Sequence, residues 1–286
     1  KRGGVGVVDL DTKDEDFVKI FLHTTTHADL LFFTDAGKVY QIKMYDIPEG
    51  RRATRGKSIM NFISLSPEEE ITSVIPMPKD IKNTADLSVM MVTKDGVAKK
   101  VEAKSFHDVR RSGIIAISLA KDDKLVRATF VEKGDEMIVV SSEGQSIRFK
   151  ESDVRQMGRT AAGVNGLTLK SKDFVIGADV IHKNTTAKTL LVFSEQGYGK
   201  QTDLKEYKVQ KRGGSGIKTA KVTAKIGKLI SACVITDELE EIVTISKKSQ
   251  VVRVDLKEVP KLGRQTQGVK IMKLRAGDSI ASTVCF

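Results

Sequence analysis

The chain has 286 residues and carries 48 Lys and Arg against 37 Asp and Glu, a formal net charge of +11 and a pI near 9.5. This surplus favours a polyanionic partner, either nucleic acid or an anionic membrane face. No run of 18 apolar residues is present, no secretory pattern opens the chain, and only Cys233 and Cys285 occur, so we expect no membrane partner, no disulfide framework and a cytoplasmic location.

In chain order, three recurring phrases predict β-strands. The phrase that opens each repeat is rich in Val, Ile and Phe, as a buried strand requires. Its six copies cover residues 17–22, 71–75, 125–131, 174–181, 229–235 and 280–286. Helical periodicity is nearly absent, apart from a possible helical turn at residues 66–70.

The second phrase is a hairpin, in which two β-prone runs flank a polar turn. Its five copies centre on Gly37, Gly96, Gly144, Gly197 and Ser249. Glycine suits such a turn because it adopts positive φ without strain. Ser249 breaks this pattern, so we expect its turn to differ in type or to be strained.

The third phrase is a glycine followed by alternating apolar residues. Its six copies begin at intervals of 50, 57, 50, 53 and 52 residues, at Gly6, Gly56, Gly113, Gly163, Gly216 and Gly268. One repeat of about 52 residues therefore has four strands, and radially repeated four-stranded sheets are typical of a propeller. We predict an all-β, six-bladed ring in which residues 1–286 form a single domain, with part of one blade missing upstream of residue 1 because only five hairpins are found.

Basic residues recur at one position of this repeat. An arginine stands four residues before the glycine in five copies, at Arg2, Arg52, Arg159, Arg212 and Arg264. In the other copy Arg110 and Arg111 follow Val109, and further cations flank these loops at Lys1, Arg51, Arg55, Lys57, Arg155, Lys211, Lys218 and Lys261. Equivalent loops of a ring share one rim, so we predict a positive belt that binds DNA phosphates without reading sequence.

No catalytic, nucleotide or metal site is predicted. Residues 50–58 nearly spell a P-loop, but the spacing is one residue too long and a strand, rather than a helix, is expected to follow. The four histidines form no metal motif, and no pair of carboxylates is placed for acid–base chemistry.

The basic loops also carry a family resemblance. The segment Gln210-Lys211-Arg212-Gly213-Gly214-Ser215-Gly216 resembles the GyrA box, the signature of the C-terminal domain of DNA gyrase A subunits, and Lys1-Arg2-Gly3-Gly4-Val5-Gly6 resembles a second copy without its leading Gln. Both copies lack the usual basic residue at the sixth box position, where Val5 and Ser215 stand. Glu151 to Gly158 and Gly263 to Val269 resemble later family stretches, so the likeness spans the whole chain.

This resemblance implies a six-bladed β-pinwheel, with strands exchanged between blades, that wraps double-stranded DNA around its perimeter. The implied partners are the rest of the gyrase A dimer and the gyrase B subunits in an A2B2 holoenzyme, which introduces negative supercoils. ATP, Mg²⁺ and the active-site tyrosine are then expected elsewhere in the holoenzyme, with no cofactor in this domain.

Three alternatives remain open. The corresponding domain of topoisomerase IV is the nearest, although its members lack a clear box and often have fewer blades. A protein-interaction propeller would not concentrate cations at one repeat position. A propeller hydrolase would need a nucleophile, base or metal constellation.

Overall fold

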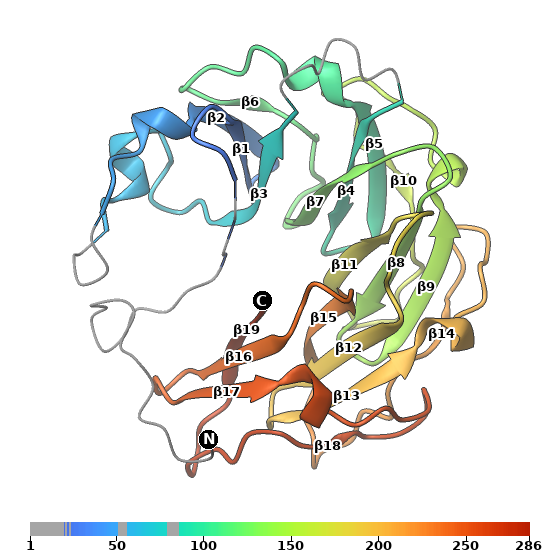
Figure 1. Ribbon diagram of the computed structural model, residues 1–286. Helices are drawn as coiled ribbons and strands as arrows, with labels where there is room; N and C mark the ends of the chain where they lie inside the picture. Colours follow the sequence, from blue (N-terminus) through green and yellow to red (C-terminus); the bar gives the residue numbers. More distant parts are fainter. Residues whose placement is uncertain (1–19, 21, 23, 51–55, 79–85) are drawn as a thin grey trace.

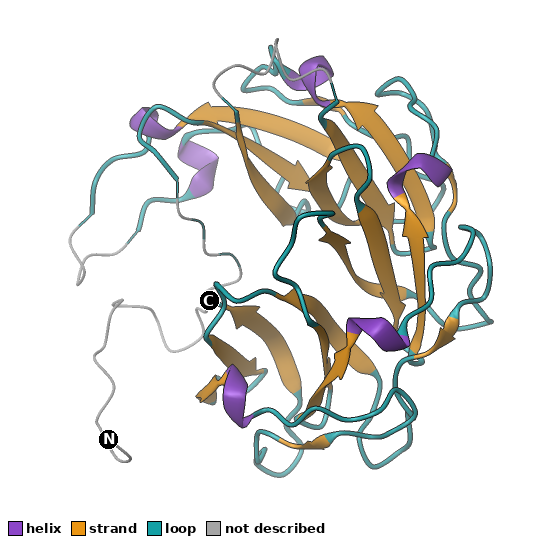
Figure 2. Cartoon of the chain, turned by 45° about the vertical axis from the view of Figure 1, so that its right-hand side comes forward, coloured by secondary structure: helices purple, strands orange, loops and turns teal. Residues whose placement is uncertain are grey.

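The chain forms five β-sheets that follow one another around an arc in chain order (Figure 1). The computed structural model describes residues 20, 22, 24–50, 56–78 and 86–286. The helices of this part are all short 3-10 turns, located between strands (Figure 2). The all-β prediction is confirmed.

Each sheet is built on one hairpin. The strand that follows the hairpin in the sequence lies toward the centre of the arc (Figure 1), and we call it the inner strand. The hairpins are β1 (Asp29–Thr34) with β2 (Lys38–Lys43), β4 (Ser88–Thr93) with β5 (Val97–Glu102), β8 (Glu136–Ser141) with β9 (Gln145–Lys150), β12 (Thr189–Ser194) with β13 (Tyr198–Asp203), and β16 (Glu241–Ser246) with β17 (Val251–Asp255). The inner strands are β3 (Ile71–Met77), β7 (Leu125–Val131), β11 (Val175–Ile181), β15 (Leu229–Ile235) and β19 (Ile280–Cys285). The hairpins and inner strands match the predicted phrases closely, because Val, Ile and Phe runs broken by polar turns leave few other solutions.

The glycine-led strands are exchanged between sheets. They are only two residues long, β6 (Ile114–Ile115), β10 (Val164–Asn165), β14 (Ile217–Lys218) and β18 (Val269–Lys270). Each pairs with the hairpin of the sheet before its own, so that the first sheet has the order β3-β1-β2-β6 and the second β10-β5-β4-β7. We call these sheets blades 1 to 5, and blade 5 has three strands, β17-β16-β19.

The prediction of six blades is wrong, because the described residues contain five. Every blade needs a hairpin of its own, whereas a glycine-led segment only completes a neighbouring blade. Counting six glycine-led copies therefore overcounted the blades.

Gly56 is followed by a 3-10 helix, η2 (Ile59–Asn61), instead of the expected strand, and residues 66–70 form a turn without a helix. The copy at Gly6 and most of residues 17–22 lie outside the described residues.

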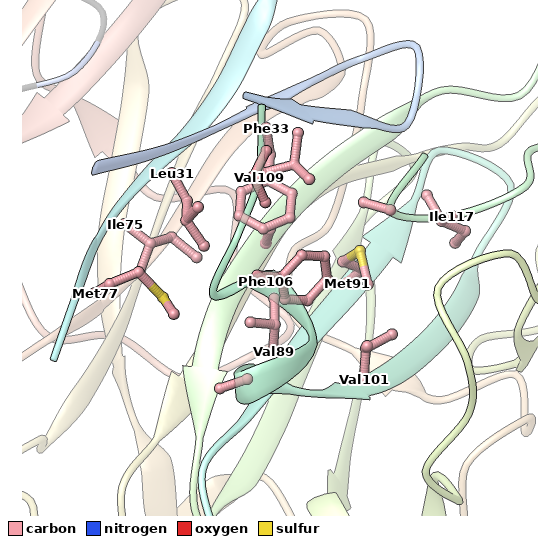
Figure 3. Packing of buried hydrophobic residues seen from close by; sticks show 14 of the residues in the cluster. Leu31, Phe33, Ile75, Met77, Val89, Met91, Val101, Phe106, Val109 and Ile117 are labelled. Carbon is pink, nitrogen blue, oxygen red and sulfur yellow. The ribbon is translucent and has the colours of Figure 1, made fainter. Parts of the chain in front are cut away.

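The hydrophobic core is divided into clusters between successive blades. Between blades 1 and 2, Leu31 and Phe33 pack against Val89, Met91 and other buried side chains (Figure 3). Phe33 and Phe106 meet edge to face, with ring centroids 5.7 Å apart. Three further clusters fill the spaces between the later blades in the same way. Each blade is thus fixed by its neighbours, which holds equivalent loops at equivalent places.

The inner strands are also linked from blade to blade by polar side chains. Ser73 of β3 accepts a hydrogen bond from the Ala128 amide of β7 at 2.9 Å, and Asp179 of β11 accepts one from the Val234 amide of β15 at 2.9 Å.

Candidate nucleic-acid interface

The predicted site residues that the structure describes lie on the loops between blades and at their edges. Four such loops, covering residues 107–113, 155–163, 208–216 and 261–268, each lead from one blade to the exchanged strand of the blade before it. Here we call them the rim loops. Seven of the predicted cations lie on these loops, namely Arg110, Arg111, Arg155, Arg159, Lys211, Arg212 and Arg264. Lys218 lies in β14, the strand that follows the third loop, and Lys57 lies beside blade 1. Lys1, Arg2, Gly3, Gly4, Val5, Gly6, Arg51, Arg52 and Arg55 lie outside the described residues.

Backbone bridges fix where three of the rim loops begin. Lys100, Arg148 and Gln201 occupy equivalent places in β5, β9 and β13, and they form isolated parallel bridges with Gln156, Val209 and Lys261. The side chains of Arg148 and Gln201 also donate to carbonyl oxygens of the 3-10 turns η6 (Leu204–Glu206) and η7 (Leu256–Glu258). Each of these loops therefore begins alongside the second hairpin strand of the preceding blade.

The residue that lies beneath each rim loop differs from blade to blade. It is the third residue after the hairpin turn, namely Tyr40, Lys99, Ile147 or Lys200 in blades 1 to 4. All four side chains are essentially without solvent exposure. Sequence reasoning missed this position, because an alternating strand does not reveal which loop covers it.

The two buried lysines brace the rim loops above them. The Lys99 ammonium donates to the carbonyl oxygens of Ala116 and Arg159. The Lys200 ammonium donates to the carbonyls of Gly263 and Arg264, both at 2.7 Å, and to the Thr266 hydroxyl at 3.0 Å. Burial lowers the pKa of each ammonium to about 8, because charge is costly away from water.

Two of the predicted arginines donate hydrogen bonds to backbone carbonyls of other parts of the rim. The Arg212 Nη1 donates to the Asn165 carbonyl at 2.9 Å, and the Arg264 Nη1 donates to the Lys218 carbonyl at 2.9 Å. In both cases the acceptor lies two residues after the glycine that opens the preceding exchanged strand. These guanidinium groups are half-buried and tie successive rim loops together.

A carboxylate faces three of the four rim loops. Asp46 bonds Arg111 at 2.9 Å, Asp153 bonds Lys211 at 2.9 Å, and the Glu206 carboxylate lies 3.9 Å from the Nε of Arg264. These acids share one position in the repeat, nine residues after the hairpin turn residue. At this position blade 2 carries Ser105, an exposed residue within η4 (Ala103–Phe106).

The box-like segment 210–216 forms the rim loop between blades 3 and 4. Its backbone is docked at its start and near its middle, since the Gln210 amide donates to the Arg148 carbonyl at 2.7 Å and the Gly213 amide donates to the Gly166 carbonyl at 2.6 Å. Gly216 has φ +68°, and any side chain there would collide with the Ser146 carbonyl. Ser215, which stands where the family has a basic residue, is exposed.

Other kinds of site find no support in the described part of the chain. No group of three His, Cys, Asp or Glu side chains is placed to hold a metal ion there. None of the helices in the described ranges has the length and apolarity needed to span a bilayer. Cys233 and Cys285 are both free thiols that pack beside the core between blades 4 and 5.

The family model and the curated relatives that match this chain agree on one family. The model of the DNA gyrase C-terminal domain, described as a beta-propeller, matches residues 28–76, 88–132, 135–182, 188–235 and 240–286, one stretch for each blade. The DNA gyrase A subunit of Staphylococcus aureus (strain NCTC 8325 / PS 47) is 38% identical over 283 residues, which is 99% of this chain and 31% of that protein. The same protein of Staphylococcus epidermidis is 36% identical over 281 residues, again 31% of its length. The chain thus spans about a third of the curated relatives that it matches.

Solved structures show the same architecture. A DNA gyrase A C-terminal domain aligns with a TM-score of 0.76 and 29% identity, covering 92% of this chain and 84% of that one. A C-terminal domain of DNA topoisomerase IV aligns with a TM-score of 0.85 and 25% identity, covering 97% and 84%. Shape alone does not separate these two groups, whereas the sequence match favours gyrase A. The chain belongs to the DNA gyrase C-terminal domain family.

Proposed function

We propose that the chain binds double-stranded DNA through its backbone phosphates and wraps it along the rim loops, as the C-terminal part of a gyrase A protein. The observation that carries this proposal is that each of the four successive loops between blades carries arginine, with lysine or a second arginine beside it. Arginine suits this role because its planar fork donates two hydrogen bonds to one phosphate.

The balance of energies supports wrapping over simple contact. Bending 20–30 base pairs by 40–90° costs on the order of 1–6 kcal/mol. About six phosphate contacts would release enough counterions that log K falls by about five for a tenfold rise in salt. A belt with several cations per loop can therefore offset the bending cost at moderate ionic strength.

Within the whole protein, we propose that this wrapping serves ATP-dependent negative supercoiling in the bacterial cytoplasm. The partners would be the rest of the gyrase A dimer and the gyrase B subunits. We propose that ATP, Mg²⁺ and the catalytic tyrosine act in those other parts and that this domain needs no cofactor. Tyr40 and Tyr207 are buried, and their hydroxyls hydrogen-bond Glu69 at 2.9 Å and Thr219, which supports a catalytic tyrosine outside this domain.

A second candidate is the corresponding role in topoisomerase IV, which the TM-score of 0.85 favours. The blade count no longer argues against it, because the described chain has five blades. The 38% identity to gyrase A over 99% of the chain, with the box-like segment at 210–216, makes gyrase the better-supported interpretation.

A topology assay tests the proposal. The chain is incubated with nicked circular DNA at 50 and 300 mM salt, the nick is sealed, the protein is removed, and the linking number is measured against protein concentration. We expect a progressive shift at low salt that weakens at high salt. The control is a variant carrying Arg110→Ala, Arg155→Ala and Lys211→Ala together, in which the shift should be greatly reduced.

The outcomes separate the candidates. Binding without a change in linking number would replace chiral wrapping by simple bending and favour the second candidate. An absence of binding at 50 mM salt would overturn the nucleic-acid proposal.

A further inference from the structure

The four rim loops are not equal in charge, because one of them has no carboxylate facing it. In the loops at 107–113, 208–216 and 261–268 a cation meets Asp46, Asp153 or Glu206. In blade 2, which precedes the loop at 155–163, the equivalent position of the repeat holds Ser105. The neutral side chain at this one position leaves the loop between blades 2 and 3 without its counter-charge.

The cations of that loop are unpaired in the part of the chain that the structure describes. Neither Arg155 nor Arg159 has a side-chain hydrogen bond or an ion pair there, in contrast to Arg111, Lys211, Arg212 and Arg264. The two acids nearest to Arg155 in the sequence are already engaged. Glu151 pairs with Lys100, and Asp153 pairs with Lys211.

A third positive charge lies directly underneath. The Lys99 ammonium is fully buried and bonds only the neutral carbonyls of Ala116 and Arg159. Lys200 has the same place under the loop at 261–268, but Glu206 lies near enough to favour its charged form. For Lys99 the charged neighbour that matters is Arg159, another cation.

The backbone of the loop is also held in place, so that only the arginine side chains have to be ordered on binding. The Met157 amide donates to the Lys100 carbonyl at 2.9 Å, and the Ser118 hydroxyl donates to the Thr160 carbonyl at 2.7 Å. Preorganised donors lose less conformational entropy when a ligand binds than mobile ones do. A phosphate meeting this loop therefore finds free arginines on a fixed backbone.

We propose that the loop at 155–163, with Arg155 and Arg159 above the buried Lys99, is the strongest phosphate-binding point among the four described rim loops. The inference rests on the proposed function, since it concerns where along the rim DNA is held most tightly. In each of the other three loops a carboxylate competes with the phosphate for one of the cations, namely Arg111, Lys211 or Arg264. The single residue that sets this difference is Ser105.

The test transfers the carboxylate from one loop to another. Ser105→Asp gives blade 2 the acid that blades 1, 3 and 4 have, and Ser105→Asn is its uncharged control. DNA affinity of the full 286-residue chain is measured by fluorescence anisotropy with a labelled 30-base-pair duplex at several salt concentrations. Since one phosphate contact is worth about eightfold in affinity at 0.1 M salt, Ser105→Asp should weaken binding roughly eightfold and lower the salt slope by about one.

The reciprocal change should act in the opposite direction. Glu206→Gln frees the Arg264 guanidinium from its carboxylate and should strengthen binding by up to about eightfold. Ser105→Asn should leave both affinity and salt slope unchanged. Thermal unfolding of each variant checks that the fold is kept, and the position is exposed and holds an acid in other blades.

A second pair of variants keeps the proposal falsifiable if Ser105→Asp disturbs the turn. Arg159→Ala should cost roughly eightfold in affinity, whereas Lys133→Ala, which removes the same charge from the exposed turn after β7, should cost less than twofold. Equal losses for the two would overturn the proposal, as would an unchanged affinity for Ser105→Asp. Failure of the unsubstituted chain to bind the duplex would instead overturn the proposed function.

Discussion

Blades 2 and 5 are built from the same repeat but differ in how completely they are covered. Every residue of β4 in blade 2 is buried, and the blade has four strands. Blade 5 has three strands, and the residues of its outer strand β17 alternate between exposed and half-buried. Val251 is 59% exposed, whereas Ala98, at the equivalent place in β5, is fully buried.

The difference follows from the exchanged strand. In blade 2 the Gly96 carbonyl accepts hydrogen bonds from the amides of Gly166 and Leu167 at 2.8 and 3.0 Å. These two residues directly follow β10, the strand that a later repeat supplies. At the equivalent turn of blade 5, no such segment docks on Ser249 among the described residues. A blade of this family is therefore complete only when the next repeat lends it a strand.

The largest effect is expected at the turn of blade 2. Gly96 has φ +86°, and a Cβ added there would collide with the Leu167 carbonyl oxygen of the docked segment. Gly96→Ala should therefore lower the free energy of unfolding by about 2–4 kcal/mol, from backbone strain and the displaced segment together. Urea unfolding measures this, with Gly56→Ala as the control, because no atom lies within 4 Å of a Cβ added at Gly56. A loss below about 1 kcal/mol would show that the docked segment moves freely.

The pH dependence of stability sharpens the same comparison. The pKa of Lys99 falls from 10.5 to about 8 on folding, whereas blade 5 has the uncharged Val252 at this position. Between these values the unfolded chain binds more protons than the folded one, so stability rises with pH from about 8 towards 10.

We expect a gain of about 1–3 kcal/mol across that window, because a difference of one in pKa between the two states corresponds to about 1.4 kcal/mol. The measurement is the urea midpoint at pH 7.5, 8.5 and 9.5, compared with Lys99→Met. The gain should shrink in that variant, while Val252→Met should leave it unchanged. An identical profile for Lys99→Met would mean that Lys99 does not lose its proton in this range.

A smaller gain is expected from repairing the turn of blade 5. Ser249 has φ +58°, in the left-handed region where other hairpin turns of this chain have glycine. The sequence therefore predicted the strain correctly. Ser249→Gly should raise the free energy of unfolding by about 1 kcal/mol, and Ser249→Ala should change it little, because alanine meets the same strain. Thermal unfolding of the two variants distinguishes them, and a stabilised alanine variant would contradict the explanation.

The smallest effect is expected on the uncovered strand of blade 5. Val251→Thr places a hydroxyl on a solvent-facing side and should change stability by less than about 0.5 kcal/mol. The same change at the fully buried Val101 of β5 should cost about 1–3 kcal/mol, because the hydroxyl has to be desolvated. Equal costs would indicate that β17 is covered in solution.

Much of the local structure could be predicted from the sequence alone. Leu125–Val131 and Leu229–Ile235 form strands with the predicted bounds, because runs of β-branched and apolar residues between polar turns have few alternatives. The turns at Gly96 and Ser249 were also located correctly, since positive φ is a local requirement. The rim loops could be recognised by the recurrence of arginine at one position of the repeat.

Which strand joins which blade was decided by the tertiary structure. A two-residue strand such as Val164–Asn165 has no periodicity that identifies its partner. It pairs with β5 of another repeat, so a glycine-led copy completes a neighbouring blade and does not mark a blade of its own. Likewise, Lys99 is in the sequence only one cation among many in an alternating strand. Its burial beneath the loop that carries Arg159 depends on a contact across 60 residues of chain. Local propensity sets strands and turns, whereas charge compensation between blades is a property of the assembled ring.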